Sequence, residues 1–313
     1  MESIEPLISV VMPSFNHEKY ISKTIDSVLE QDYSNIELII IDDGSTDSSR
    51  SIIEKYQSLD SRIIAIFHES NRGIAKTLTD GLEHTNGTYI SLIGSDDIWY
   101  KSKLTKELEL VTSNIKNIVW SEGDIIDSNG QDLGIDFVSD LHHARWKNKN
   151  GQILGDLLTG PYVFGQSLLF HRDLMDGLRF NDNYRFLNDY LFFLDLFARG
   201  NSIYIEEPTA AYRIHGKNSI LSDQKQWLRE GVKVSEYLID QYSSVMSPRA
   251  RSVWTLTFVK NSILLGNYHA ALAYTKSKMN TIFSIASFKV VMDSLLKDRR
   301  PLRIVGNLKI VQK

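Results

Sequence analysis

Hydrophobic and polar positions alternate in a regular order along the first hundred residues. Four short apolar runs rich in β-branched residues each end in a polar turn, and a segment with apolar residues at helical spacing follows each turn. The runs cover residues 7–12, 36–41, 63–67 and 89–93. Strand, turn and helix repeated in this way predict an α/β fold with a doubly wound parallel sheet.

The polar turns between these elements are the first candidates for a functional site. Right-handed crossovers bring the carboxyl ends of parallel strands to one edge of the sheet, and ligands bind in the crevice at that edge. We therefore expect the turns to meet in a single groove. They lie at residues 14–16, 42–43, 71–73 and 95–97.

The pattern is less regular after residue 117, and helical after residue 222. We expect short strands at residues 118–120, 124–127, 133–138, 165–170 and 203–205, a helix at 187–199 and a polar loop at 212–219. Further helices are predicted at residues 252–265, 268–278 and 280–297. This division predicts one domain over residues 1–220 and a helical region over residues 221–313.

Composition and charge narrow the class of protein. The chain of 313 residues is 42% hydrophobic and 24% charged, as in ordinary globular proteins, and it has no cysteine for disulfides or thiolate metal sites. We see no signal peptide and expect no membrane span. Residues 241–313 hold 12 Lys/Arg and 2 Asp/Glu, whereas the rest holds 23 and 37. This basic region suggests an anionic partner, either nucleic acid or a membrane surface; a helical cap or a dimer contact explains it equally well.

Asp96 and Asp97 are the most informative residues for chemistry. Two adjacent carboxylates after a buried strand are costly unless something neutralises them. A divalent cation that carries a phosphorylated ligand would do so, because Mg²⁺ sites use one or two carboxylates and leave other positions to water and phosphate. The alternative is a solvated helix start, where Asp is a good cap.

Six fragments in order resemble the inverting family 2 glycosyltransferases, which have the GT-A fold. They are SVVMPSFNHEKYI, QDYSNIELIIIDDGSTDSS, NRGIAKTLTDG, GTYISLIGSDDIW, FNDNYRFLNDYLFFLDLFARG and YRIHGKNS. The resemblance covers roughly residues 7–220. Within the family the chain looks most like bacterial enzymes that extend lipid-linked O-antigen or capsular oligosaccharides.

The resemblance implies a nucleotide site at the strand ends. Asp43 would accept a hydrogen bond from the uracil ring, and Asp96 would lie nearer the ribose. Arg72 and Lys76 could add positive charge at the diphosphate. The other residues that this resemblance places at the nucleotide are Pro13, Ser14, Phe15, Asn16 and Ser95.

The resemblance also implies the catalytic groups. Asp97 would bind Mn²⁺ or Mg²⁺ directly, and His215 would help to hold the metal or the diphosphate. A metal acts there as a Lewis acid on the leaving diphosphate. Asp189 would be the base that takes the proton of the acceptor hydroxyl, a role that typically raises the reaction rate by about 10²–10⁴-fold. Taken singly, Asp189 and His215 also fit a helix-start acid and a structural histidine.

The acceptor site and the departures from the family pattern complete the prediction. The acceptor pocket should use residues 120–166, such as Trp146, Tyr162 and Gln166, although no motif identifies them. Relatives often have an acid at the position of Gly94 and a glutamate at that of Asn188. The QxxRW motif of processive enzymes does not follow, so we expect a non-processive enzyme.

Other classes fit less well. A nucleotidyltransferase or a Rossmann dehydrogenase would need a glycine-rich loop after the first strand, and PSFNHEKY is not one. We predict a metal-dependent transferase that moves a hexose or N-acetylhexosamine from a UDP-sugar to a lipid-linked saccharide in bacterial surface polysaccharide synthesis. It would be cytoplasmic or peripheral on the inner membrane face, without a nucleic-acid partner. The alternative is a non-catalytic sugar-nucleotide or saccharide-binding protein of the same fold.

Overall fold

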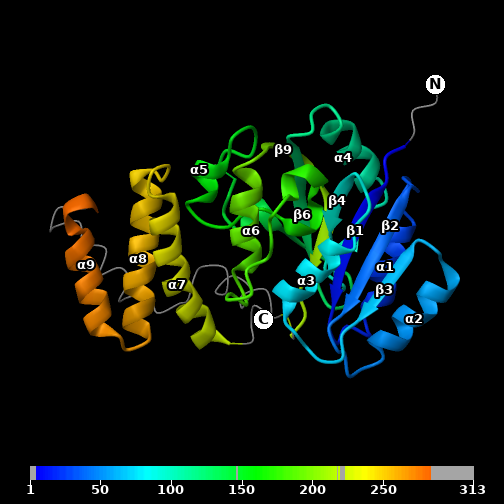
Figure 1. Cartoon of the computed structure of the whole chain (residues 1–313), viewed down its shortest axis with the longest axis horizontal. Helices are drawn as coiled ribbons and strands as arrows, with labels where there is room; N and C mark the ends of the chain where they lie inside the picture. The colour runs from blue at the N-terminus through cyan, green and yellow to red at the C-terminus, as the bar shows by residue number, and fades with distance from the viewer. Residues whose placement is uncertain (1–4, 146, 217, 219–222, 283–313) are drawn as a thin grey trace. The chain divides into compact units, whose positions relative to one another are not determined.

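The structure is a computed structural model that describes residues 5–145, 147–216, 218 and 223–282. Its chain forms two compact units. Residues 1–153 and 162–215 make the first unit, and residues 154–161 join residues 216–313 in the second. Figure 1 shows the elements of both units along the chain.

The first unit contains the predicted doubly wound sheet. Within the described residues, nine strands form one sheet in the order β3-β2-β1-β4-β8-β6-β9-β5, with β7 paired to β6. The strands β1 to β4 are parallel neighbours. They span Ile8–Ser14 (β1), Ile36–Asp42 (β2), Ile63–Phe67 (β3) and Tyr89–Leu92 (β4). The four predicted strands are therefore confirmed.

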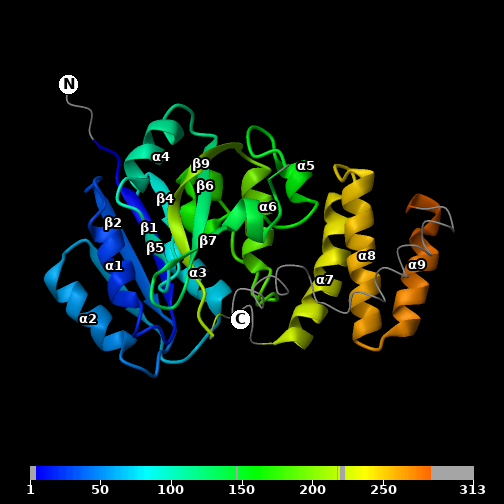
Figure 2. The same ribbon diagram turned by 180° about the vertical axis from the view of Figure 1, so that it is seen from behind.

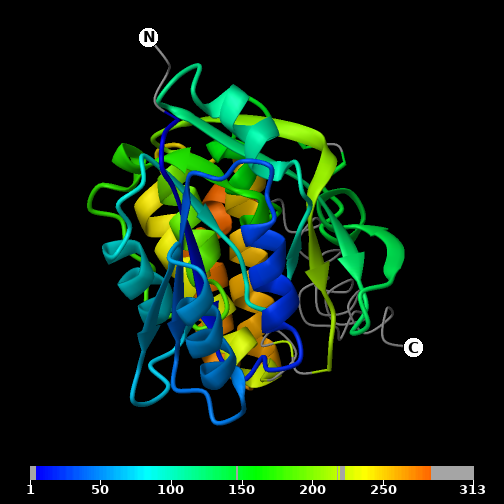
Figure 3. The same cartoon turned by 90° about the vertical axis from the view of Figure 1, so that its right-hand side faces the viewer.

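Three helices connect these strands on both faces of the sheet. They are α1 Ile21–Leu29, α2 Ser49–Leu59 and α3 Ile74–Glu83. Strand order reverses between β1 and β4, so α3 returns on the opposite face from α1, as Figures 2 and 3 show. Such a reversal opens a crevice at the carboxyl ends of the strands. Ser14 pairs with Asp42 in register, so β1 and β2 end side by side at this crevice.

The second half of the sheet differs from the prediction in detail. It consists of β5 Ile98–Trp99, β6 Asn117–Ile126, β7 Asp132–Asp136, β8 Leu169–His171 and β9 Asn201–Arg213. Two predicted short strands form the single strand β6, and β5 was not predicted. Residues 165–167 form a 3₁₀ turn before β8 rather than strand.

Strand β9 continues through residues 206–213, where the sequence suggested that it had ended. Glu206, Glu207 and Pro208 interrupt the apolar pattern, and the two glutamates are exposed. A shift in the β6–β9 register between Ser121 and Gly123 accommodates this segment, and pairing resumes at Ala210. A bulge of this kind re-aims the following residues. The strand thereby reaches Arg213, so His215 follows directly on its end.

Short helices complete the first unit. They are α4 Lys103–Val111, the π-helical turn Phe137–Leu141, the 3₁₀ turn Arg172–Met175 and α6 Asn188–Phe197. The helix predicted at residues 187–199 thus forms. The ring of Phe192 in α6 stacks on the ring of Phe180, with 4.2 Å between their centroids. The backbone amide of Phe180 in turn donates to Thr79 Oγ1 of α3 at 3.3 Å. These contacts tie α6 to α3.

The second unit is helical in its described part. It contains α5 Leu154–Leu157, α7 Gln224–Tyr242, α8 Pro248–Leu264 and α9 Tyr268–Ile282. Trp254 Nε1 donates to the Leu158 carbonyl at 2.7 Å, which joins the segment after α5 to α8. Residues 280–282 extend α9 instead of starting a new helix, and the rest of the segment predicted at 280–297 lies outside the described residues. Among the described helices, none has the length and apolar character needed to cross a bilayer.

A buried ion pair stabilises the side of the sheet that carries α4. Lys103 Nζ contacts Glu107, and both side chains are fully buried. Lys103 also donates to Ser91 Oγ at 3.2 Å, and Glu107 Oε1 accepts from Thr209 Oγ1 at 2.9 Å, so the pair links β4 to β9. Burial raises the pKa of Glu107 to about 7, even though the charge of Lys103 and the hydrogen bonds from Lys103 and Thr209 act in the opposite direction.

Substitution of Lys103 tests this pair. Lys103→Met leaves Glu107 buried without a counter-ion, which should lower the free energy of unfolding by about 3–5 kcal/mol in chemical denaturation. Lys103 lowers the pKa of Glu107, so this pKa should be higher still in the variant. Because folded Glu107 then holds its proton more tightly than in the unfolded chain, the stability of the variant should fall as the pH rises from about 5 to 8. The double variant Lys103→Met/Glu107→Leu is the control and should recover most of the loss. Equal stabilities of the two variants would contradict this interpretation.

Candidate functional site

The predicted turns meet at the carboxyl edge of the parallel strands. The Asn16 amide donates to Ser45 Oγ at 2.9 Å, which joins the turns after β1 and β2. His17 Nδ1 lies 2.8 Å from Ser95 Oγ, which joins the turns after β1 and β4. Asn16 has a φ of 56°, a left-handed conformation that asparagine tolerates better than most residues. The predicted convergence of these turns is therefore present in the structure.

Asp43 orders the loop that follows β3. Its Oδ1 accepts from the Arg72 amide and lies near His68 Nδ1, both at 2.8 Å, while Oδ2 accepts from the Gly73 amide at 2.9 Å. His68 Nε2 in turn lies 3.0 Å from Asp80. A carboxylate offers about four acceptor positions, and these contacts occupy three. Asp43 can therefore hold the loop and still accept one hydrogen bond from a base.

The two basic side chains predicted to bind the diphosphate each form an ion pair with a carboxylate. Arg72 Nη1 lies 2.6 Å from Asp80, and Lys76 Nζ lies 3.5 Å from Asp182. The side chains of Arg72 and Lys76 are about half exposed. Contact of either cation with a diphosphate would require its ion pair to open, so this role stays a prediction.

The end of β1 presents polar and aromatic groups to the same edge. Phe15 is 41% exposed, whereas Pro13 is half-buried. Ser14 Oγ and Asp42 Oδ1 are buried and lack a hydrogen-bond partner among the described residues. An unpaired buried polar atom costs about 1–3 kcal/mol, so a ligand or water that paired with these atoms would be favoured here.

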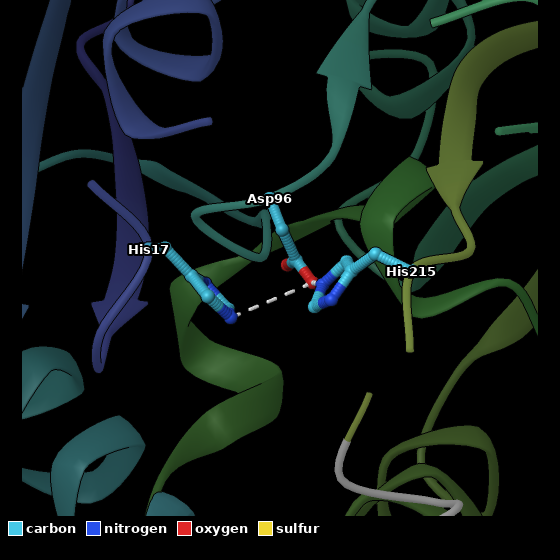
Figure 4. Close-up of side chains that lie close together, drawn as sticks. All are labelled: His17, Asp96 and His215. Atoms are coloured by element: carbon cyan, nitrogen blue, oxygen red, sulfur yellow. Dashed lines mark hydrogen bonds and ion pairs between the residues drawn. The ribbon is translucent and has the colours of Figure 1, made fainter. Parts of the chain in front are cut away.

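Asp96 lies between two histidines from distant parts of the chain. His215 Nε2 is 2.9 Å from Asp96 Oδ2, and His17 Nε2 is 3.8 Å from the same oxygen. Figure 4 shows the three side chains pointing toward one another from the ends of β1, β4 and β9. Burial by itself raises the pKa of Asp96, but the hydrogen bond from His215 and the charges of His17 and His215 hold this pKa below its usual range.

Asp97 has a different environment from its neighbour. Its Oδ1 accepts from the Arg213 amide and its Oδ2 from Gln166 Nε2, both at 2.9 Å. Burial, and then the charge of Asp96, raises the pKa of Asp97 well above its usual range. Both oxygens of Asp97 thus have protein partners, whereas Asp96 faces the histidines. The structure favours Asp96 as the carboxylate that would face a metal, and direct ligation by Asp97 stays a prediction.

The cluster of His17, Asp96 and His215 fits a divalent cation. One ligand atom from each residue can be chosen so that all three lie within 4.8 Å of one another. Imidazole nitrogen and carboxylate oxygen are both common ligands of divalent metals. A Cβ at position 94 would lie 2.9 Å from Asp97 Oδ2 and 3.0 Å from Asp96 Oδ1, so Gly94 provides the space for both carboxylates. His17 was missed in the sequence, where only its place after the first strand could have indicated it.

Asp189 lies in the first turn of α6 and is exposed. Its Oδ1 accepts from the Tyr190 amide at 2.6 Å, and the start of a helix favours a negative charge. Asn188 is buried, and its Nδ2 donates to the Arg185 carbonyl at 2.9 Å. An exposed carboxylate at this position can accept a proton from a bound hydroxyl, so the role of base for Asp189 stays a prediction.

The three residues predicted at the acceptor site differ in what the structure shows of them. Gln166 supports Asp97, and its carbonyl accepts from Trp99 Nε1 at 2.7 Å, so it positions the acidic pair. Tyr162 is buried, and its hydroxyl donates to the Asn148 carbonyl at 2.9 Å. Contact of Tyr162 with an acceptor would require this side chain to be uncovered. Trp146 lies outside the described residues.

Comparison with known proteins identifies relatives of this chain. The family model described as glycosyl transferase family 2 matches residues 9–177. The Bacillus subtilis protein TuaG, named for teichuronic acid biosynthesis, is 42% identical over 111 residues, or 36% of this chain and 44% of TuaG. The Escherichia coli enzyme WfgD is 36% identical over 123 residues, or 39% of this chain and 48% of WfgD. WfgD is named as a β-1,3-glucosyltransferase from UDP-Glc to α-D-GlcNAc-diphosphoundecaprenol. The matches thus span less than half the length of these two relatives.

Solved structures share the fold at low sequence identity. S. aureus TarS in complex with UDP-GlcNAc has a TM-score of 0.65 at 14% identity, over 97% of this chain and 90% of that one. The mannosyltransferase PcManGT from Pyrobaculum calidifontis, solved with GDP-Man and Mn²⁺, has a TM-score of 0.60 at 15% identity, over 99% and 87%. Together with the family match, these likenesses confirm the predicted GT-A fold.

Substitution of Gly94 tests whether the two carboxylates form a cation site. In Gly94→Ala the added Cβ displaces Asp96 or Asp97, whose oxygens it would meet at about 3 Å. We expect weaker cation binding by about ten- to a hundredfold, the effect typical of disturbed metal surroundings. Isothermal titration with MnCl₂ in the presence of UDP measures it. Gly155→Ala, where a Cβ would meet nothing within 4 Å, is the control; equal affinity of both variants would contradict the site.

Proposed function

Because the chain belongs to glycosyl transferase family 2, we propose that it transfers a hexose or N-acetylhexosamine from a UDP-sugar to a saccharide hydroxyl, with inversion at the sugar. The observation that carries this proposal is the cluster of His17, Asp96 and His215 at the crevice where β1, β2 and β4 end. A cation site beside a nucleotide crevice suits transfer from a nucleotide diphosphate sugar.

The donor would bind along the ends of β1 and β2. Asp43 has an acceptor position left for a uracil N–H after its three loop contacts. Phe15 offers an exposed aromatic surface to the base, and Ser14 offers an unpaired hydroxyl. The complex of TarS with UDP-GlcNAc supports a UDP-sugar donor for this chain. Asp43 would therefore select uridine while it keeps the loop ordered.

The cation would be held by Asp96 with the histidines of the cluster. When bound, Mn²⁺ or Mg²⁺ supplies Lewis-acid neutralisation of the diphosphate charge that develops as the glycosidic bond breaks. The complex of PcManGT with GDP-Man and Mn²⁺ supports a divalent cofactor. Arg213 contributes to the positioning of this site, because its Nε donates to the Asp96 carbonyl at 2.7 Å and its amide binds Asp97.

Asp189 would act on the acceptor. A carboxylate oxygen of Asp189 takes the proton of the acceptor hydroxyl while the hydroxyl oxygen attacks C1, and the diphosphate leaves with the electron pair of the broken bond. Attack opposite the leaving group inverts the anomeric centre. The exposed position of Asp189 at the start of α6 supports access to such a hydroxyl.

The acceptor would be a saccharide linked to a lipid diphosphate, and the product a bacterial surface polysaccharide. The names of TuaG and WfgD support this assignment. The enzyme would then be non-processive and would act at the inner face of the cytoplasmic membrane. Membrane attachment or a dimer contact through the basic C-terminal region stays a prediction, because residues 283–313 lie outside the described part.

A screen of nucleotide sugars tests the proposed function. The purified chain is incubated with UDP-hexoses and UDP-N-acetylhexosamines, with and without Mn²⁺ or Mg²⁺, and released UDP is measured. We expect one UDP-sugar to be consumed only when metal is present, because hydrolysis reports the same activated leaving group. UDP-sugar binding without metal-dependent turnover would favour the non-catalytic binding protein.

Asp189→Asn tests the base. The variant should fold and bind UDP like the wild type, but transfer to an acceptor should fall by about 10²–10⁴-fold, the usual contribution of a positioned base. Asp173→Asn is the matched control, because Asp173 is another acidic residue in the first turn of a short helix. Transfer rates are measured with the sugar found in the screen, and wild-type turnover in Asp189→Asn would remove the assignment.

A further inference from the structure

His68 is a buried histidine that lies against Asp43. We infer that His68 is a positioning residue for donor binding: it holds Asp43 so that one carboxylate oxygen is left for the base, and the site thereby prefers uracil to cytosine. This inference rests on the proposed function for the place of the base. It adds the residue that orients Asp43 and the pyrimidine that this orientation rejects.

The sheet places His68 next to Asp43. Phe67, the last residue of β3, pairs with Asp42 of β2 in register. The His68 amide then donates to the Asp42 carbonyl at 2.9 Å, which continues the ladder by one residue. The side chains of His68 and Asp43 are both buried. Their contact is therefore a consequence of the register between β2 and β3.

Each ring nitrogen of His68 faces a carboxylate. Nδ1 lies 2.8 Å from Asp43 Oδ1, and Nε2 lies 3.0 Å from Asp80 Oδ2. An ionised carboxylate can only accept hydrogen bonds, so Nδ1 must carry a hydrogen in order to bond to Asp43. Asp80 comes from α3 and contacts the opposite side of the ring. Contacts on both sides therefore fix the orientation of the imidazole toward Asp43.

Asp80 connects His68 to the loop that Asp43 binds. The Asp80 oxygen that faces His68 also lies 2.6 Å from Arg72 Nη1. The backbone amide of Arg72 in turn donates to Asp43 Oδ1 at 2.8 Å. The contacts therefore close into a ring in which each residue holds the next. Hydrogen bonds in such a network polarise and strengthen one another where water is largely excluded.

The two oxygens of Asp43 differ in how many contacts they make. Oδ1 faces both the Arg72 amide and His68, which fill its two acceptor positions, whereas Oδ2 accepts the Gly73 amide alone among the described residues. The vacant acceptor position therefore belongs to Oδ2. Without the hydrogen bond from His68, Oδ1 would offer a second vacant position, and the carboxylate could turn toward a different donor.

A single fixed acceptor position distinguishes the two pyrimidines. Uracil presents an N–H at N3, which can donate to Asp43 Oδ2, whereas cytosine presents a lone pair at N3, which an ionised carboxylate repels. A site built for one pattern of donors rejects the other because polar groups are left unpaired. A carboxylate that could turn would reach the exocyclic amino group of cytosine instead. Loss of the contact from His68 should therefore lower the preference for uracil.

Two amide substitutions at residue 68 separate the two contacts of the ring. The amide of His68→Asn lies near the place of Nδ1 and keeps a donor for Asp43, whereas that of His68→Gln reaches the place of Nε2 and keeps a donor for Asp80 only. Isothermal titration of the whole chain with UDP and with CDP, both with MnCl₂ present, measures the two affinities. We expect the ratio of UDP to CDP affinity to fall by about tenfold or more in His68→Gln, the usual effect of losing a hydrogen bond to a charged group. His68→Asn should stay close to the wild-type ratio.

The hydrogen at Nδ1 gives a second readout that does not depend on the folding of either variant. In nitrogen-15 spectra of the histidine rings of the wild-type chain, the assigned Nδ1 of His68 should carry a hydrogen, because it faces a carboxylate that can only accept. A His68 ring without a hydrogen at Nδ1 would overturn the inference.

The titrations also separate this inference from the proposed function. Equal UDP to CDP ratios in His68→Gln and His68→Asn would overturn the positioning role, because lost packing alone affects both variants. A wild-type chain that binds UDP no better than CDP would overturn the inference together with the choice of uridine. If the wild type prefers UDP and His68→Gln does not, but no UDP-sugar is consumed, the inference stands while the proposed transfer fails.

Discussion

The cost of placing two adjacent carboxylates at the end of a buried strand determines how this edge of the sheet is built. Asp97 is compensated by the Arg213 amide and by Gln166, and Asp96 by two histidines. These partners come from the turn after β1, from the segment before β8 and from the end of β9. The acidic pair therefore depends on residues supplied both by the parallel strands β1 to β4 and by the mixed half of the sheet, β5 to β9.

This requirement explains the long, irregular strand β9. Had β9 ended near residue 205, neither the Arg213 amide nor His215 would reach the acidic pair. The register shift opposite Ser121 and Gly123 carries the strand past its exposed glutamates, so Arg213 lies beside Asp97. Gly94 serves the same arrangement, since a Cβ there would lie only about 3 Å from an oxygen of each carboxylate and one of them would have to shift.

The parallel strands, the polar turns and their convergence could be predicted from the sequence, because each rests on a local apolar run and on the handedness of crossovers. The partner of each carboxylate could not. Asp96 and Asp97 are neighbours with the same side chain, and the partners that distinguish them among the described residues lie 69 to 119 positions away. For the same reason the sequence could not show that Gln166, predicted at the acceptor, donates a hydrogen bond to Asp97. Nor could it show that Arg72 and Lys76 form ion pairs with carboxylates.

We expect a uridine diphosphate sugar, a cation and a base to act together in one groove. The most direct measurement is a crystal structure of the chain with Mn²⁺ and the UDP-sugar that it consumes. We expect the ion to be bound by His17, Asp96 and His215 and by the diphosphate, with the uracil against Asp43 and the sugar accessible to Asp189. An ion bound away from these histidines, or a nucleotide outside the groove at Asp43, would contradict this expectation.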